Sequence, residues 1–265
     1  MRKSGKVALM AGAAATLCFG TGYSADAVEG GSGMPLPTAV VEIYGQSSTG
    51  AWGCSGSLIG QNWILTANHC TGENQSSVSM SVSEDGGASW HSVTEIDRSP
   101  DGADVALLKT ADVMPVPSGD GEHQGGYMKL ADATDPEPAI GDIVTASGYG
   151  PGSGKFTQPR SARRKVMSYD SSTIGSEGTG CGIAGGCAVY GDSGGPVTKI
   201  YTESDANGNV TVTEKVIGVT DTASWPNGFP PDPTQEGSCY TWAHALFAPM
   251  NGMTERQWIR NTTGL

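Results

Sequence analysis

The stretch Gly191-Asp192-Ser193-Gly194-Gly195-Pro196 decides how this chain is interpreted. Its glycines leave backbone N–H groups around the serine free to point at a reacting oxyanion. A serine hydroxyl is a weak nucleophile until an imidazole takes its proton, and a carboxylate must fix the tautomer of that imidazole. Two upstream stretches supply these groups, Leu65-Thr66-Ala67-Asn68-His69-Cys70 and Ala103-Asp104-Val105-Ala106-Leu107-Leu108. Together they predict a hydrolase that acts by acyl transfer.

Asp104 is the carboxylate that best fits this chemistry. Asp97 and Asp101 lie nearby, but only Asp104 is followed at once by Val-Ala-Leu-Leu, a run expected to form a buried strand. The other histidines lack a comparable context and are interpreted as ordinary surface or core residues: His91, His123 and His244. No spacing resembles a metal site, so neither a metal nor a cofactor is expected.

These motifs resemble those of the trypsin/chymotrypsin-like serine peptidases, in their bacterial form. Gly148-Tyr149-Gly150 is similar to the family's Gly-Trp-Gly, and Gln257-Trp258-Ile259 is similar to its closing helix. The resemblance implies an all-β fold of two six-stranded antiparallel β-barrels of the chymotrypsin type with a C-terminal α-helix. It implies a peptidase domain over 28–265, made of an N-terminal barrel at about 28–130, a C-terminal barrel at about 140–250 and a helix at about 253–261.

The resemblance also assigns roles to single residues. Ser193 would attack the scissile carbonyl, and His69 would act first as general base and then as general acid. Asp104 would orient His69, and the amides of Gly191 and Ser193 would form the oxyanion hole. The expected activity is that of a secreted serine endopeptidase that hydrolyses protein or peptide substrates through an acyl-enzyme.

The substrate pocket is expected to include Ala188, Tyr190 and Asp221. In trypsin the base of this pocket carries an aspartate six residues before the serine, and Cys187 occupies that place here. We therefore expect a preference for an apolar or small side chain on the acyl side of the cleaved bond. Asp221 would reverse this preference if its side chain pointed into the pocket.

Residues 1–27 have the basic start, apolar stretch and small-x-small cleavage site of a secretory signal peptide. Cleavage would begin the mature chain at Val28, in a stretch similar to the family's activated terminus, Ile-Val-Gly-Gly. The resemblance implies that the new α-ammonium of Val28 pairs with Asp192 and orders the oxyanion turn. Glu29 departs from the usual apolar second residue, and the alternative is a disordered leader.

An odd number of cysteines follows the signal peptide, in a chain expected to reach an oxidising compartment. The family implies a disulfide between Cys54 and Cys70, which fastens the histidine loop, and a second between Cys187 and Cys239. Cys181 lacks its usual upstream partner, so it is either free or competes with Cys187 for Cys239.

The composition limits the class of partner. A formal net charge of −12 argues against nucleic acid, because phosphate binding needs a clustered basic face. The one basic cluster, residues 158–165, is expected to be a solvated loop that runs into a strand. We expect a monomer with no membrane association after signal removal, whose partners are its substrate and, as a further candidate, a protein inhibitor.

Short strands joined by turns are favoured by 40 glycines and 15 prolines. Asn207-Gly208 predicts a hairpin, because both residues tolerate positive φ. Residues 112–141 are expected to connect the two barrels. The expected strands are residues 38–44, two within 52–66, 78–82, 89–96, 105–108, 199–201 and 210–219.

Two other functional classes compete with the peptidase. A non-catalytic binding protein on the same scaffold would usually lack triad members, whereas all three are present here. An esterase that uses the same triad on small esters stays open. The Gly-x-Ser-x-Gly elbow of α/β-hydrolases also fits residues 191–195, but that fold places its histidine after the serine, where only His244 is found.

Overall fold

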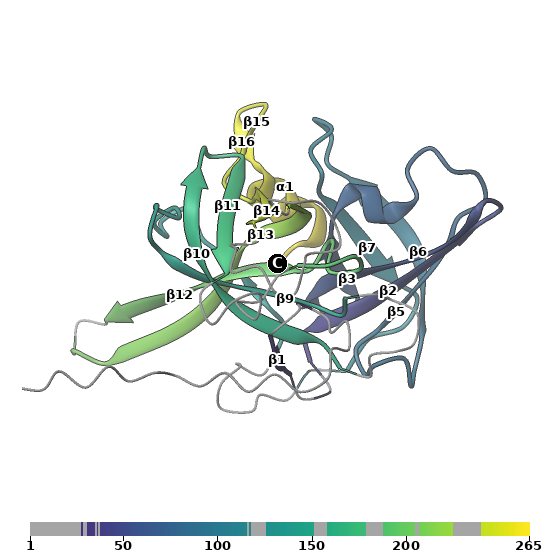
Figure 1. Ribbon diagram of the computed structural model, residues 1–265, viewed down its shortest axis with the longest axis horizontal. Helices are drawn as coiled ribbons and strands as arrows, with labels where there is room; N and C mark the ends of the chain where they lie inside the picture. Colours follow the sequence, from purple (N-terminus) through teal and green to yellow (C-terminus); the bar gives the residue numbers. More distant parts are fainter. Residues whose placement is uncertain are drawn as a thin grey trace, which may run out of the picture.

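The computed structural model shows two β-barrels packed together, with the C-terminal helix α1 near their junction (Figure 1). It describes residues 28, 31–34, 36, 38–115, 117, 126–150, 158–178, 188–204, 207–224 and 240–265. The expected signal peptide, residues 1–27, lies outside the described residues. The same is true of three cysteines, Cys181, Cys187 and Cys239. Within the described ranges, no helix is long and apolar enough to cross a membrane.

Six antiparallel strands close the first barrel, because the last strand in the pairing order pairs back to the first. In that order they are β2 (Val40–Ser47), β3 (Gly50–Gly60), β4 (Trp63–Thr66), β7 (Ala106–Thr110), β6 (His91–Arg98) and β5 (Ser79–Ser83). Alternation decides which side chains point inward: Ile43 is buried in the core while Tyr44 beside it is exposed.

The second barrel also closes with six antiparallel strands. In pairing order they are β9 (Ile143–Gly148), β10 (Arg160–Tyr169), β11 (Thr173–Gly178), β14 (Tyr240–Ala245), β13 (Val210–Ser224) and β12 (Pro196–Ser204). Two short strands add to it, β1 (Ser32–Gly33) on β10 and β8 (Lys129–Leu130) parallel to β13. The predicted all-β fold of two six-stranded barrels with a C-terminal helix is confirmed.

The C-terminal helix begins later than the sequence predicts. Met253–Thr254 forms strand β16, which pairs with β15 (Pro249–Met250), and α1 spans Glu255–Thr263. Thr254 is the N-cap and forms a capping box with Gln257, which satisfies two backbone N–H groups that a helix end leaves unpaired. The predicted start at 253 is therefore wrong by two residues. Residues 253 and 254, which periodicity assigned to the helix, instead pair with β15 as a strand.

Helix α1 stabilises the junction of the two barrels. Trp258 and Ile259 are buried in one apolar cluster with Leu108 of the first barrel and Val216 of the second. Burial of such side chains stabilises by about 1.5–3 kcal/mol each, so the helix fastens the barrels that must together form a site.

The basic cluster departs from the expectation of a solvated loop. Residues 160–165 belong to strand β10, and the Arg164 side chain is fully buried. Its guanidinium donates to the hydroxyl of Ser176 at 3.0 Å and to the carbonyl of Ser176 at 2.9 Å. Burial lowers the pKa of Arg164 to about 10, and nearby acidic groups oppose that shift. The expected strand is therefore present, and the expected solvation is wrong at Arg164, because hydrogen bonds across the sheet satisfy its buried guanidinium.

A buried carboxyl group lies where α1 begins. Glu255 is fully buried, and its Oε1 lies 2.9 Å from the Ser99 hydroxyl, which also lies 2.7 Å from Asp101 Oδ1. One hydroxyl hydrogen serves only one of these acceptors, so a proton on Glu255 supplies the second bond. Burial raises the pKa of Glu255 to about 7; the Ser99 bond opposes this and the charge of Asp101 adds to it.

The Glu255→Gln substitution should therefore change how stability depends on pH. A raised pKa in the folded state means that native Glu255 contributes its full stability below about pH 4.5 and loses it as pH rises through about 7. Between about pH 5 and about pH 8, the wild-type melting temperature should fall by about 3–6 °C relative to Glu255→Gln. Thermal unfolding at both pH values measures this, with Glu95→Gln, on the exposed face of β6, as control. Parallel wild-type and Glu255→Gln curves would contradict the assignment.

Candidate active site

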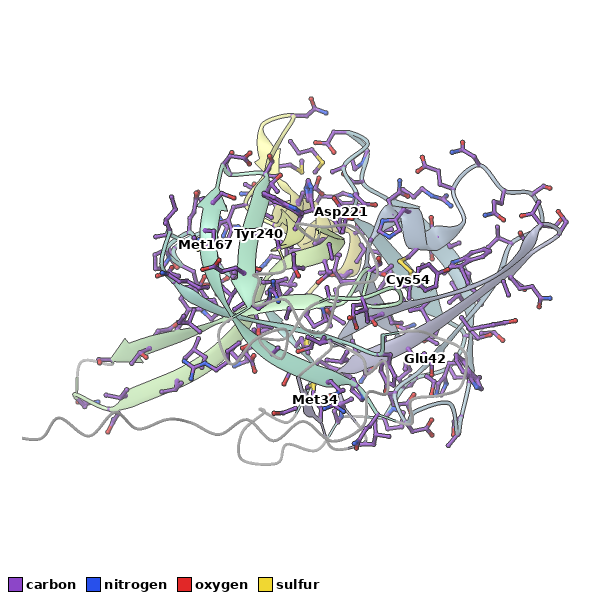
Figure 2. The ribbon with its side chains drawn as sticks, in the orientation of Figure 1. Met34, Glu42, Cys54, Met167, Asp221 and Tyr240 are labelled. Carbon is purple, nitrogen blue, oxygen red and sulfur yellow. A yellow bond between two sulfur atoms is a disulfide. The ribbon has the colours of Figure 1, made fainter. Side chains whose placement is uncertain are left out.

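His69 is held by a short, covalently fastened turn. It lies in the 3₁₀ helix η1 (Asn68–Thr71), directly after β4, and Gly72 ends that helix in the left-handed region. The predicted Cys54–Cys70 disulfide is confirmed, with its Cα atoms 6.1 Å apart, and its bridge is visible at Cys54 in Figure 2. Trp52 Nε1–H donates to the Cys70 carbonyl at 2.8 Å. These contacts fix the turn that carries the imidazole against β3.

Asp104 lies directly opposite this turn. Strand β7 begins two residues after it, and the pairing of Thr66 with Ala106 brings the ends of β4 and β7 together. The carboxylate accepts the Nδ1–H of His69 at 2.8 Å and the backbone N–H of His69 at 2.8 Å. A ring held with its proton on Nδ1 keeps Nε2 unprotonated, as a general base requires.

The loop before β12 carries Ser193 and is tied to the first barrel. The backbone N–H of Ser55 in β3 donates to the Ser193 carbonyl at 2.8 Å, and the Ser55 hydroxyl donates to the Gly191 carbonyl at 2.8 Å. The Gly194 N–H donates to the Thr220 carbonyl of β13 at 2.7 Å. Ser55 was not singled out from the sequence, where its only signal is its position beside Cys54.

The amides expected to form the oxyanion hole are unengaged within the described part of the chain. Neither the Gly191 N–H nor the Ser193 N–H donates to a described acceptor, although the flanking amides of Asp192 and Gly194 do. Gly191 has φ +99°, a conformation that a side chain rarely adopts. Two such donors can receive an external oxygen, which is the geometric requirement for an oxyanion hole.

Ser193 and His69 line one cavity of about 360 Å³, together with Trp52 and Tyr190. The Ser193 hydroxyl donates to the Asp221 carbonyl at 3.3 Å, and no hydrogen bond joins it to His69 among the described groups. Contacts between nucleophile and base are often long without substrate and tighten when substrate binds. The structure therefore places His69 and Ser193 at one cavity, but the Ser193 hydroxyl is not hydrogen-bonded to the His69 ring.

A second cavity of about 240 Å³ adjoins Ser193. All three residues predicted for the substrate pocket line it: Ala188, Tyr190 and Asp221. The remaining lining residues are Val189, Thr220, Thr222 and Ala223. The Asp221 carboxylate also lies within 4.8 Å of the ligand atoms of His69 and Asp104, so it approaches the histidine–aspartate pair as well as the cavity.

The charges of the site favour an ionised Asp104 beside His69. The hydrogen bond to Asp104 raises the pKa of His69, burial opposes that shift, and the charges of Asp104 and Asp221 add to it. Burial alone would raise the pKa of Asp104, but the bonds and charge of His69 and a bond from Asp221 hold that pKa below its usual value. The carboxylate therefore stays ionised and can stabilise an imidazolium.

Asp192 is buried behind the serine loop, next to Val28. Its carboxylate accepts the backbone N–H groups of Val28 at 3.0 Å, of Val189 at 2.8 Å and of Gly150 at 2.8 Å. Burial raises the pKa of Asp192 to about 7, while these bonds and the charge of Arg164 oppose the shift. The two residues expected to form the activation pair are thus in contact.

The two barrels, with the cavity between them that His69 and Ser193 line, define the chymotrypsin-like class of fold. The family described as Trypsin matches residues 37–222, so the chain belongs to the trypsin family of serine peptidases, which hydrolyse peptide bonds. A crystal structure of a scabies mite inactivated protease paralogue matches with a TM-score of 0.56 and 16% identity, covering 92% of this chain and 99% of that one. At that identity the likeness shows the fold alone. Comparison with curated proteins found no match.

Gly194 offers a test of how tightly the serine loop is packed. A Cβ at Gly194 would overlap Thr66 Oγ1 and the Ser55 carbonyl, whereas one at Gly208 would meet open space, although φ is +81° and +82° respectively. Gly208→Ala should therefore cost only the backbone strain, about 1–2 kcal/mol or about 2–6 °C in melting temperature. Gly194→Ala should add a clash, for a total loss of about 8 °C or more. Equal losses in thermal unfolding would contradict this packing.

Proposed function

We propose that this protein is a secreted serine endopeptidase, exported by a bacterial cell, that forms an acyl-enzyme on Ser193. The double contact of Asp104 with His69, in a cavity that Ser193 also lines, supports this proposal most directly. It combines an ionised carboxylate that fixes the tautomer of His69 with a cavity that both His69 and Ser193 line.

In the proposed reaction, substrate binding turns the Ser193 hydroxyl from the Asp221 carbonyl toward Nε2 of His69. The hydroxyl oxygen attacks the scissile carbonyl while its proton passes to Nε2, and Asp104 stabilises the imidazolium. The carbonyl oxygen becomes an oxyanion that the amides of Gly191 and Ser193 receive. His69 then donates the proton to the leaving amine, and water hydrolyses the acyl-enzyme by the same steps.

The pocket supports a preference for small or apolar side chains. Ala188, Val189 and Ala223 contribute apolar surface to the cavity beside Ser193, and its volume of about 240 Å³ holds a side chain of moderate size. The approach of the Asp221 carboxylate to His69 and Asp104 argues against its use as an anchor for a basic side chain. Cys187, which occupies the position of trypsin's pocket aspartate, lies outside the described residues.

Cleavage before Val28 is the proposed activating step. Val28 is buried with φ +38°, which is strained for a β-branched residue. That torsion includes the carbonyl carbon of residue 27, so cleavage between residues 27 and 28 abolishes it. Cleavage also replaces a neutral amide beside the buried Asp192 carboxylate with an ammonium, which compensates the buried charge. Signal removal and activation would then be one event.

The nucleophile is tested by labelling the secreted protein with a fluorophosphonate probe. Ser193→Ala and His69→Ala should each abolish labelling and lower kcat by about 10⁵–10⁶-fold on a cleavable peptide, whereas Ser204→Ala, at the exposed end of β12, should retain both. A peptide library would then report the preferred side chain. The matched crystal structure is that of an inactivated protease paralogue, so a folded wild-type chain that neither labels nor cleaves would instead indicate a binding protein on this scaffold.

The terminus is tested by comparing a chain that starts at Val28 with one that keeps Ala27. The first should be active, and the second should lose about 10²-fold or more in kcat, because an unformed oxyanion turn removes donors to the transition state. Asp192→Asn should lower the activity of the Val28 form toward that of the extended form. N-terminal sequencing of the active secreted protein checks where the native chain begins. Equal activity of the two lengths would overturn this step.

A further inference from the structure

We propose that Asp221 is a positioning residue of the catalytic cluster, a second carboxylate whose negative charge makes His69 keep its proton to higher pH. This inference rests on the proposed function, and it gives Asp221 a role other than the substrate-pocket role that the sequence suggests. In Figure 2 Asp221 lies between the two barrels.

A β-bulge directs Asp221 out of its sheet. The pairing of β13 with β14 shifts register between Thr220, which pairs with Ala243, and Thr222, which pairs with Trp242. Asp221 is the extra residue at that shift and has no partner in the ladder, an arrangement that re-aims a side chain. The same bulge frees the Asp221 carbonyl to accept the Ser193 hydroxyl at 3.3 Å.

The carboxyl groups of Asp221 and Asp104 meet beside His69. One oxygen of each, together with a ring nitrogen of His69, lies within 4.8 Å of the other two atoms. Two carboxyl groups can hydrogen-bond to each other only when one of them carries a proton. The bond between the two carboxyl groups lowers the pKa of Asp104 and raises that of Asp221. Asp104 also accepts two N–H groups of His69, which favour its ionised form, so the proton of that bond belongs to Asp221.

The electrostatics agree with that geometry. Burial and the charge of Asp104 raise the pKa of Asp221, and the charge of His69 opposes the shift. As pH rises, Asp221 loses its proton and places a second negative charge beside the imidazole. That charge stabilises the protonated form of His69, because opposite charges at this range favour the charged form. The free base needed for catalysis then appears at a higher pH.

The other titratable groups near this cluster do not supply a competing cation. His244 on β14 is influenced by the charge of Asp104, but burial lowers its pKa while the charges of Asp104 and Asp101 oppose the shift. Its Nε2 lies 3.9 Å from Glu255, whose raised pKa of about 7 keeps it largely neutral at acidic pH. Within the described residues, His69 is thus the cation that the Asp221 charge acts on most directly.

Asp221→Asn separates charge from shape, because the amide is isosteric, can still donate to Asp104 and cannot ionise. The acid limb of its kcat/KM profile, which rises as His69 loses its proton, should move to lower pH by about half to one unit. Asp221→Ala also removes the charge, so its acid limb should move in the same direction. Because it cannot donate to Asp104, its kcat should fall by about tenfold on the acid limb, where wild-type Asp221 still holds its proton, with little change in KM.

The His69 titration can also be read without turnover. In the Ser193→Ala background, an NMR chemical-shift titration of His69 should give a pKa that Asp221→Asn lowers by about half to one unit. Asp112→Asn, which removes an equal charge from an exposed position outside the site, should leave both the profile and the NMR pKa unchanged. Fluorophosphonate titration of each active variant counts the competent sites and corrects for any loss of folding.

An unmoved acid limb and NMR pKa in Asp221→Asn would overturn the inference. A change in KM and in peptide preference, with the acid limb unmoved, would instead assign Asp221 to the substrate pocket. If the wild-type chain neither labels nor cleaves, the proposed function fails, while the NMR titration still decides whether Asp221 acts on His69.

Discussion

The site depends on one interaction, the acceptance of two N–H groups of His69 by a single carboxylate. Asp104 bonds both the ring and the backbone of His69, so it fixes the imidazole relative to its own main chain. A ring held at one point could rotate about χ1, whereas this contact sets position and tautomer together. The closed first barrel keeps the two residues together, because β4 and β7 pair where they meet the site.

The second barrel must then present Ser193 at the correct depth. Ser55 does much of this work, because its backbone N–H holds the Ser193 carbonyl and its hydroxyl holds the Gly191 carbonyl. Both bonds cross between barrels, as does the apolar packing around Trp258. The position of Ser193 is therefore set by the interface itself, and a change in barrel packing would move Ser193 relative to His69 and Asp104.

Buried and half-buried acids surround this interface. Asp192, Asp104, Asp221 and Glu255 each have a pKa displaced from its usual value, and each lies where the barrels or the terminal helix meet. The cost of burying these charges is offset in different ways. Backbone N–H groups bond to Asp192 and His69 bonds to Asp104, whereas Asp221 and Glu255 hold protons that they share with neighbours. Stability and activity should thus respond to pH through separate groups.

The sequence by itself determined the histidine, aspartate and serine motifs, which are local properties of the chain. The barrel fold, the Cys54–Cys70 disulfide and the grouping of residues at the site followed from the resemblance of those motifs to the trypsin/chymotrypsin-like family, because strand alternation alone does not specify how strands pair. Only the tertiary structure decided what happens where distant strands meet. The bulge at Asp221, the bridging role of Ser55 and the burial of Arg164 depend on pairing between strands far apart in sequence. Periodicity specifies which face of a strand is buried, but it contains no information about which polar partner lies across the interface.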